Sequence, residues 1–124
     1  MSILNNEIKG FFRHVSSHED GRITAQIAFP KNFTGFKGHF PGNPVVPGVC
    51  EVFSILVLLE LALKRKARLK TIVLAKFLSM IRCDEEVTVE LRRETKNGPA
   101  ECVKAIFRSA DNKIADIQIE VNYE

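Results

Sequence analysis

The segment that most constrains the fold is "VCEVFSILVLLELALKRKARLK", from Val49 to Lys70. Leu, Val, Ala and Phe recur in it without a polar stripe until Lys64. A helix that is apolar around its circumference must be enclosed rather than laid on a surface. Pro47 and Gly48 suit the start of such a helix, and Glu51 in its first turn complements the helix dipole. The chain therefore needs a second layer that wraps around one long buried helix.

Alternating apolar and polar residues predict that this second layer is an antiparallel sheet. Residues Arg22 to Phe29 alternate strictly, and residues 10–15 are expected to pair with them across the turn "SHEDG". Thr71 to Leu78 is apolar on both faces, which is typical of a central strand. Glu86 to Arg92 alternates again, and "ECVKAIFR" and "KIADIQIEVNY" form a further hairpin around "ADN". About six strands and one helix make an α+β domain that spans residues 1–124.

Composition excludes several classes of function. The chain has 124 residues, 45% of them hydrophobic, which is enough for one core but not for two domains. Its net charge of +3 is too small for a dedicated nucleic-acid binder. The longest apolar run, Val52 to Leu63, is too short to cross a bilayer and contains Glu60. We expect a cytoplasmic protein, with neither a secretory signal nor membrane insertion.

Three scattered cysteines indicate neither a disulfide framework nor a zinc site. Cys50 lies at the start of the helix, where a thiol pKa can fall, but it is best interpreted as a small apolar filler. His14 and His18 lie four residues apart without a third ligand nearby, so we expect no bound metal.

One loop holds a histidine in a constrained setting just before the apolar helix. The stretch "GHFPGNPVVPGV", from Gly38 to Val49, contains three prolines and three glycines around His39. Proline fixes φ near −65°, and glycine permits backbone paths closed to other residues. The loop is therefore expected to adopt one defined shape. A histidine there can serve either structure, through a hydrogen bond, or chemistry.

This loop and the predicted topology resemble the hot-dog fold and, within it, the β-hydroxyacyl-acyl-carrier-protein dehydratases of fatty acid synthesis. "HFPGNPVVPGV" resembles the family motif HFPGxPVMPGV, with Val46 in place of the methionine. "AKFLSMIRCDEEV" is similar, more loosely, to the family's KFRRPVVPGDQL: Lys76 and Phe77 agree, while Met80 and Cys83 stand where prolines are usual.

The resemblance implies an enzyme of the hydro-lyase class that removes water from a (3R)-hydroxyacyl thioester of fatty acid or polyketide-type lipid synthesis. His39 would act as the base, and the Gly48 backbone N–H would polarise the thioester carbonyl. Such an elimination requires neither a cofactor nor a metal. The residues implied in substrate binding are Phe40, Pro41, Gly42, Pro47, Val49, Phe53 and Val57.

The chain departs from the resembling family inside the helix. The family has a Glu or Asp fourteen residues after the histidine, where this chain has Phe53, and a glutamine one turn later, where it has Val57. Glu51 precedes Phe53 by two residues, and at about 100° of rotation per residue its side chain belongs on the opposite face. Glu60 lies about two turns beyond Phe53 and is only an outside candidate for the missing carboxylate.

Three functions therefore stay open. The first is dehydration by His39 and Gly48 without the helix carboxylate; the second is a non-catalytic role, in which the chain binds acyl thioesters or pairs with a competent homologue. The third is hydrolysis by a hot-dog acyl thioesterase, which suffers from the same missing carboxylate.

The resemblance also implies partners. In the family the acyl tunnel forms between two protomers, so we expect a homodimer or a dimer of dimers. The acyl chain would arrive as a thioester of acyl carrier protein or coenzyme A. Acyl carrier proteins are acidic, so the basic run "KRKARLK" is a candidate docking surface through Lys64, Arg65 and Arg68, although a solvated helix end is the simpler interpretation.

Overall fold

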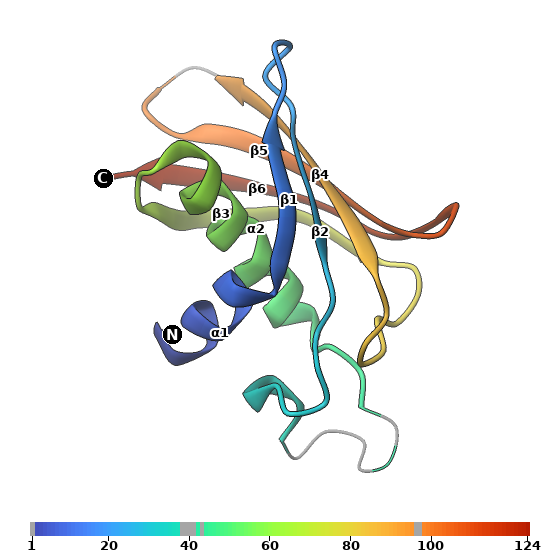
Figure 1. The fold of residues 1–124 in the computed structure, drawn as a ribbon. Helices are drawn as coiled ribbons and strands as arrows, with labels where there is room; N and C mark the ends of the chain where they lie inside the picture. The colour runs from blue at the N-terminus through green and yellow to red at the C-terminus, as the bar shows by residue number, and fades with distance from the viewer. Residues whose placement is uncertain (1, 38–41, 43, 96–97) are drawn as a thin grey trace.

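The computed structural model describes residues 2–37, 42, 44–95 and 98–124. It contains one antiparallel sheet of six strands, with helix α2 packed against the sheet and helix α1 beside α2 (Figure 1). The elements in chain order are α1 (Ser2–Phe11), β1 (Phe12–Ser17), β2 (Ile23–Ile27), a short 3-10 helix (Thr34–Phe36), α2 (Gly48–Leu63), β3 (Ala67–Phe77), β4 (Val87–Thr95), β5 (Glu101–Ser109) and β6 (Asn112–Tyr123). The predicted α+β architecture with six strands is confirmed.

The amino-terminal helix α1 is absent from the sequence prediction, which places a strand over residues 10–15. In the structure residues 10 and 11 still belong to α1, and β1 starts at Phe12. Leu4, Ile8 and Phe11 are spaced by four and three residues, so they share one side of α1, and all three pack on the core. The expected hairpin between β1 and β2 is present, with Phe12 opposite Ile27.

Helix α2 is shorter than the predicted 49–70. It ends at Leu63, and the capping residue Lys64 has a left-handed φ of +58° and an N–H that donates to the Glu60 carbonyl oxygen. The chain then turns at once into β3, because the Glu60 carboxylate accepts the Ala67 N–H at 2.9 Å. The run "KRKARLK" is therefore not a helix end: Lys64 to Lys66 form the link, and Arg68 and Lys70 lie in β3.

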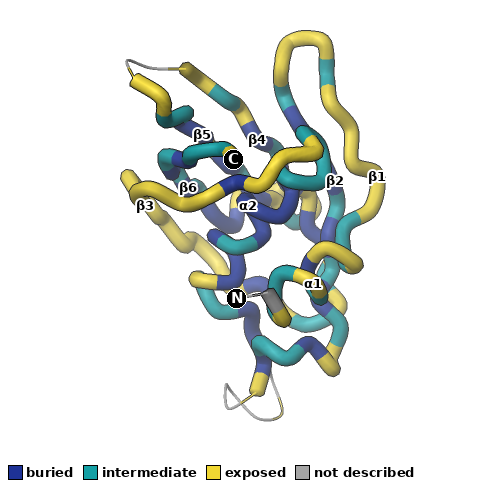
Figure 2. The backbone as a smooth tube through the Cα atoms, turned by 90° about the vertical axis from the view of Figure 1, so that its left-hand side faces the viewer, coloured by how far each residue is buried: buried dark blue, intermediate teal, exposed yellow. Residues whose placement is uncertain are grey.

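Strand β3 lies at an edge of the sheet, which corrects the prediction of a central strand over residues 71–78. The strand order is β1-β2-β4-β5-β6-β3, so β3 pairs only with β6. Every residue of β3 except Ala67 is exposed, which Figure 2 shows as a continuous yellow stretch. The apolar residues that suggested a buried strand are thus uncovered within this single chain.

The core lies between α2 and the concave face of the sheet. Alternate residues of β4, β5 and β6 are buried there, including Val89, Ala105 and Ile117. A cluster of four phenylalanines closes the end of the core near the start of α2, with ring centroids 5.2–5.8 Å apart: Phe11, Phe29, Phe33 and Phe36. Within the described residues, no helix is long and apolar enough to cross a membrane.

Candidate functional site

The start of α2 presents backbone N–H groups that meet no acceptor among the described residues. Pro47 is the residue before the helix, with φ −61° and ψ 144°, and no described side chain forms a capping hydrogen bond with the helix. The Cys50 N–H donates to the Pro47 carbonyl oxygen at 2.9 Å, whereas among the described residues no acceptor meets the Gly48 N–H. Open N–H groups and the helix dipole together favour negative charge at this point.

The segment after β3 holds the start of α2 in place. The Val46 N–H donates to the Ile81 carbonyl oxygen at 2.8 Å, and Val45 forms a bridge with Arg82. The Asp84 N–H in turn donates to the Phe29 carbonyl oxygen at 2.8 Å. The contacts of Val45 and Val46 with Ile81 and Arg82 join the two sequence stretches that carry the family resemblance. The two stretches are therefore neighbours in the structure.

Gly48 is in close contact with Phe77, the last residue of β3. A Cβ atom added to Gly48 would lie 2.9 Å from the Phe77 Cζ, closer than real Cβ atoms approach other atoms. The absence of a side chain at Gly48 thus lets an aromatic ring lie against the backbone whose N–H is open. The Phe77 side chain is itself 48% exposed, so the ring borders the surface.

Two contacts show that α2 and β3 run side by side in opposite directions. Gly48 meets Phe77 at one end, and the Glu60 carboxylate meets the Ala67 N–H at the other. Phe53 lies between Gly48 and Glu60 along the helix, about 20° of rotation from Glu60, so it points to the same side of α2.

The surface between these contacts is apolar and only partly covered. On α2, Val49 is 56% exposed and Phe53 is half-buried. On β3, Leu69, Ile72 and Phe77 stand opposite Val121, Ile119 and Ala115 of β6, all buried, so they point to the core side of the sheet. Even so, they are 39%, 49% and 48% exposed. We call this surface the α2–β3 face: Val49, Phe53, Leu69, Ile72 and Phe77.

The structure places the other predicted site residues as follows. His39, Phe40 and Pro41 lie outside the described residues. Gly42 is described and is exposed with φ +89°, a conformation that suits glycine. Val57 is 3% exposed, so it is not among the exposed apolar side chains of the α2–β3 face, and it lines a cleft of about 670 Å³ with Asn5, Asn6, Lys9 and residues near the end of α2.

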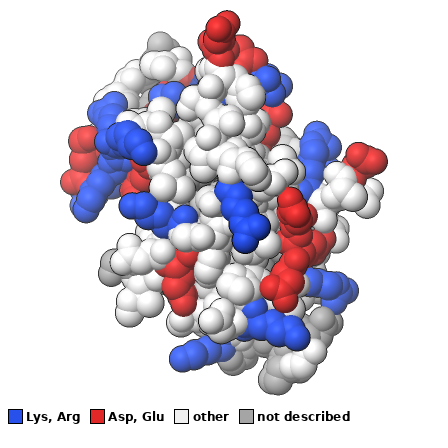
Figure 3. Space-filling view, viewed as in Figure 1, with Lys and Arg blue, Asp and Glu red and all other residues white. Residues whose placement is uncertain are grey.

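The predicted docking residues are close together where α2 ends and β3 begins. Figure 3 shows Lys and Arg side chains gathered at the upper left, with acidic side chains among them. The Arg65 guanidinium carbon lies 5.1 Å from the centre of the Tyr123 ring, a cation–π contact. Lys64 and Arg68 are exposed. The three side chains therefore form a basic surface near the carboxyl terminus.

Glu51 is buried, which its interpretation as a first-turn acid favoured by the helix dipole does not anticipate. Its side chain faces the core, opposite Phe53 as expected from the helical rotation, and the residue is 3% exposed. Its Oε1 has no hydrogen-bond partner among the described residues. Burial raises the pKa of Glu51 to about 8, so it is a neutral acid near pH 7. The sequence holds one signal for this burial: Glu51 lies one turn before Ile55, in a helix that has no polar stripe to face solvent.

Cys50 is confirmed as a buried filler. Burial, and to a smaller extent the charges of Glu51 and Glu7, raise its pKa to about 11. The thiol therefore stays protonated at neutral pH and is a poor nucleophile.

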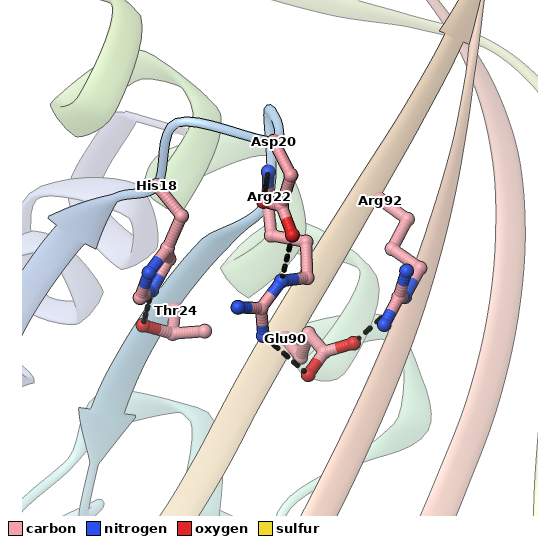
Figure 4. A network of polar contacts seen from close by, with 6 residues as sticks. All are labelled: His18, Asp20, Arg22, Thr24, Glu90 and Arg92. Atoms are coloured by element: carbon pink, nitrogen blue, oxygen red, sulfur yellow. Dashed lines mark hydrogen bonds and ion pairs between the residues drawn. The ribbon is translucent and has the colours of Figure 1, made fainter.

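Of the two histidines in the first hairpin, His18 makes a structural contact and His14 is exposed. His18 Nε2 lies 2.8 Å from Thr24 Oγ1, beside a network in which Arg22 joins Asp20 and Glu90 (Figure 4). The bonds to Arg22 lower the pKa of Asp20. In the described part of the chain, no group of three potential metal ligands comes together.

Comparison with known proteins identifies the family. A profile of the ApeI-like family, described as ApeI dehydratase, matches residues 15–117. The chain belongs to the ApeI-like dehydratase family. Among curated proteins, none matches the sequence significantly.

Solved structures confirm the hot-dog fold. The dehydratase heterocomplex ApeI:P from Xenorhabdus doucetiae contains a chain that is 16% identical, with a TM-score of 0.73, over 90% of this chain and 96% of that one. Cj0977, a sigma28-regulated virulence protein from Campylobacter jejuni, is 7% identical with a TM-score of 0.69, over 96% and 86% of the two chains. A homologue of HP0420 from Helicobacter felis is 14% identical with a TM-score of 0.68, over 90% and 87%. At these identities the likeness concerns the fold alone.

Burial of Glu51 predicts a specific pH dependence of stability. Its pKa is about 8 in the folded chain and near 4.5 when unfolded. Between these values the unfolded chain loses a proton that the folded chain keeps, so stability falls as pH rises and levels off above pH 8. Glu51→Gln has no carboxyl group to titrate. Its free energy of unfolding should therefore fall less steeply with pH than that of wild type, by up to about 1.4 kcal/mol per pH unit.

Urea unfolding of wild type and Glu51→Gln between pH 4.5 and 9 tests this expectation. Glu86→Gln, at an exposed position, is the matched control and should follow wild type. Parallel curves for wild type and Glu51→Gln would mean that the carboxyl group is solvated in the folded protein.

Proposed function

We propose that this chain is a (3R)-hydroxyacyl thioester dehydratase-type subunit of fatty acid or polyketide-type lipid synthesis. Its substrate is a 3-hydroxyacyl chain carried by acyl carrier protein or coenzyme A. The observation that carries the proposal is the open Gly48 N–H, which lies at one end of the apolar α2–β3 face and follows the loop that contains His39. Membership of a dehydratase family supports the class of reaction.

The reaction follows from the charge that each step creates. The His39 imidazole removes the proton α to the thioester carbonyl, and the electron pair of that C–H bond moves into an enolate. The Gly48 N–H donates to the enolate oxygen, where the negative charge develops. When the enolate collapses, the bond to the β-hydroxyl breaks, and the imidazolium returns the proton so that water leaves.

The acyl chain then extends along the α2–β3 face beneath a second subunit. The face is apolar but too open to enclose a chain alone, and the unpaired edge of β3 borders it. A second subunit on that edge supplies the missing wall. The expected homodimer or dimer of dimers is one such assembly, and the structurally similar ApeI:P is described as a heterocomplex.

Phe53 favours a second candidate function, a subunit that binds acyl thioesters or supports a competent homologue without turning over substrate. A phenyl ring neither accepts nor donates a proton, so it cannot replace the carboxylate that the resembling dehydratases have at this helix position. The ring lies on the α2–β3 face, where it offers the acyl chain an apolar contact.

Replacing His39 with Ala tests the catalytic proposal. We expect dehydration of 3-hydroxyacyl thioesters to fall by at least about 10²-fold, the usual contribution of a general base. We expect the melting temperature to stay near that of wild type, because a loop histidine contributes little to the core. The assay follows both dehydration and release of free thiol over several chain lengths. Thiol release without dehydration would indicate a thioesterase, and loss of activity that only follows the folded fraction would give His39 a structural role.

Restoring the helix carboxylate should increase the rate. Phe53→Glu should dehydrate a 3-hydroxyacyl thioester at least about tenfold faster than wild type, because a second acid or base takes part in proton transfer. Some stability should be lost, since a carboxylate replaces a ring packed on the core. Phe53→Gln is the matched control, with the same shape and no titratable proton, and should not gain activity.

Circular dichroism establishes that both Phe53 variants are folded. A folded Phe53→Glu variant with no gain at any chain length would favour the binding role over catalysis.

The basic surface should affect one class of substrate only. Lys64→Glu combined with Arg65→Glu should weaken binding of acidic acyl carrier protein, and the effect should diminish at high salt. Turnover of coenzyme A thioesters should not change, because these residues lie at the far end of α2 from Gly48. Lys104→Glu combined with Arg108→Glu, at two exposed positions of β5, makes the same change in net charge and is the matched control. Equal losses on both substrates would assign the surface to folding or to the acyl site.

A further inference from the structure

Glu51 takes no part in the proposed reaction, yet it lies in the same turn of α2 as Gly48. Residues three positions apart are neighbours on the surface of a helix, and Glu51 follows Gly48 by three. A helical side chain leans toward the amino terminus of its helix, so the Glu51 side chain leans over the first turn of α2. Gly48 has no side chain to stand between its own N–H and Glu51. The acid is therefore placed where it can influence the N–H that the proposed reaction uses.

The Glu51 carboxyl group is isolated in the core. The residue is 3% exposed, and its Oε1 has no hydrogen-bond partner among the described residues. The two other acids of the described helices both have donors. Glu7 accepts the Thr34 hydroxyl at 2.6 Å, and Glu60 accepts the Ala67 N–H at 2.9 Å. An ionised carboxylate without a donor or a cation is costly in a core, whereas a neutral acid is tolerated. Glu51 is therefore uncharged in the folded protein near pH 7.

The groups around Glu51 do not stabilise its charged form. Burial raises its pKa to about 8, and among the described residues no charge or hydrogen bond lowers that pKa again. Its titratable neighbours are Cys50 in the same turn and Glu7 of α1, and neither offers a positive charge. The phenylalanine cluster that closes this end of the core adds only apolar rings. Glu51 therefore ionises only when the pH rises above neutral.

The state of Glu51 decides how much positive charge the start of α2 offers to a ligand. The partial positive charge of a helix start comes from its open N–H groups, and an ionised acid in the first turn opposes it. In the proposed reaction the negative charge of the enolate develops at the same place, on the oxygen bound to the Gly48 N–H. Two negative charges about one helical turn apart repel each other strongly in a medium of low dielectric constant. An uncharged Glu51 avoids this repulsion.

We infer that Glu51 is a positioning residue for the proposed reaction: uncharged, it leaves the start of α2 free to bind the enolate oxygen, and ionised, it opposes that binding. The inference rests on the proposed function for the role of Gly48. It gives a use to a buried acid that has no hydrogen-bond partner in the described part of the chain. Glu51 then sets the alkaline limit of the reaction, while protonation of the base His39 sets the acid limit.

NMR of the free protein tests the coupling between Glu51 and Gly48 without substrate. The nitrogen resonance of Gly48 should shift as the pH rises through the Glu51 pKa of about 8. The shift should be absent in Glu51→Gln, which stays uncharged. Carbon-detected spectra follow this nitrogen even where its proton exchanges rapidly with water. Glu86→Gln, at an exposed position, is the matched control and should titrate like wild type.

Acetoacetyl coenzyme A tests the binding of an enolate without turnover. It has a ketone in place of the β-hydroxyl, so it cannot lose water, and its enolate absorbs in the near ultraviolet. The affinity of wild type for this enolate, divided by that of Glu51→Gln at the same pH, should fall by at least about fivefold between pH 6.5 and pH 9. By the same coupling, the bound enolate should raise the pKa of Glu51.

The pH profile of dehydration supplies a third readout. The kcat of wild type should fall as the pH rises through about 8, whereas Glu51→Gln should keep its rate up to pH 9. KM should differ little between them, because the ground-state carbonyl carries no full charge. Glu51→Met is a second neutral variant of similar length and should behave like Glu51→Gln. Circular dichroism gives the folded fraction at each pH, and rates are expressed per folded molecule, so a change in stability alone does not alter kcat.

Two results would overturn the inference: a Gly48 resonance that does not respond to ionisation of Glu51, or enolate binding with the same pH dependence in wild type and both neutral variants. The proposed function fails in a different way. A protein that binds the enolate with the expected pH dependence but dehydrates no 3-hydroxyacyl thioester would count against the proposed function alone. Dehydration with identical pH profiles in wild type and both variants would count against this inference alone.

Discussion

Enclosure of helix α2 is the constraint on which the rest of the structure depends. Nearly every side of the helix is apolar, so the six-stranded sheet, α1 and the phenylalanine cluster together cover most of its circumference. The strip beside β3 stays open, with Val49 56% exposed and Phe53 half-buried. Within a single chain, this strip of the helix surface is therefore not fully buried. The candidate site lies along the same strip.

The site combines one polar group, the backbone N–H of Gly48, with an apolar surface. The open Gly48 N–H requires a helix that starts without a side-chain cap, and Pro47 provides such a start. Bonds from the segment 81–84 fix the position of that helix end, while Phe77 brings the apolar surface up to the backbone. The arrangement suits a ligand with a polarised carbonyl group and an aliphatic chain, which is the composition of an acyl thioester.

The fold was largely predictable from sequence because the long apolar helix and the alternating strands leave few ways to bury both. Two errors had one origin, the use of local pattern to infer burial. Residues 71–78 look like a central strand because an edge strand with apolar residues on both faces has the same composition as a strand buried in the middle of a sheet. Glu51 looks like a surface acid because first-turn acids usually are, and only the packing around Ile55 shows that this face points inward. The short α1 contains Asn5, Asn6 and Gly10, which have low helix propensity, and it has no acid in its first turn, so the local sequence does not mark it as a helix.

The two register shifts in β3 affect how its open edge can meet the edge of any other sheet. Each additional residue, next to Lys70 and next to Val73, interrupts the regular spacing of backbone groups along the open edge. Lysines and irregular backbone on an edge strand both disfavour indefinite stacking of sheets. A chain whose β3 edge is uncovered would consequently remain dispersed instead of forming fibrous aggregates.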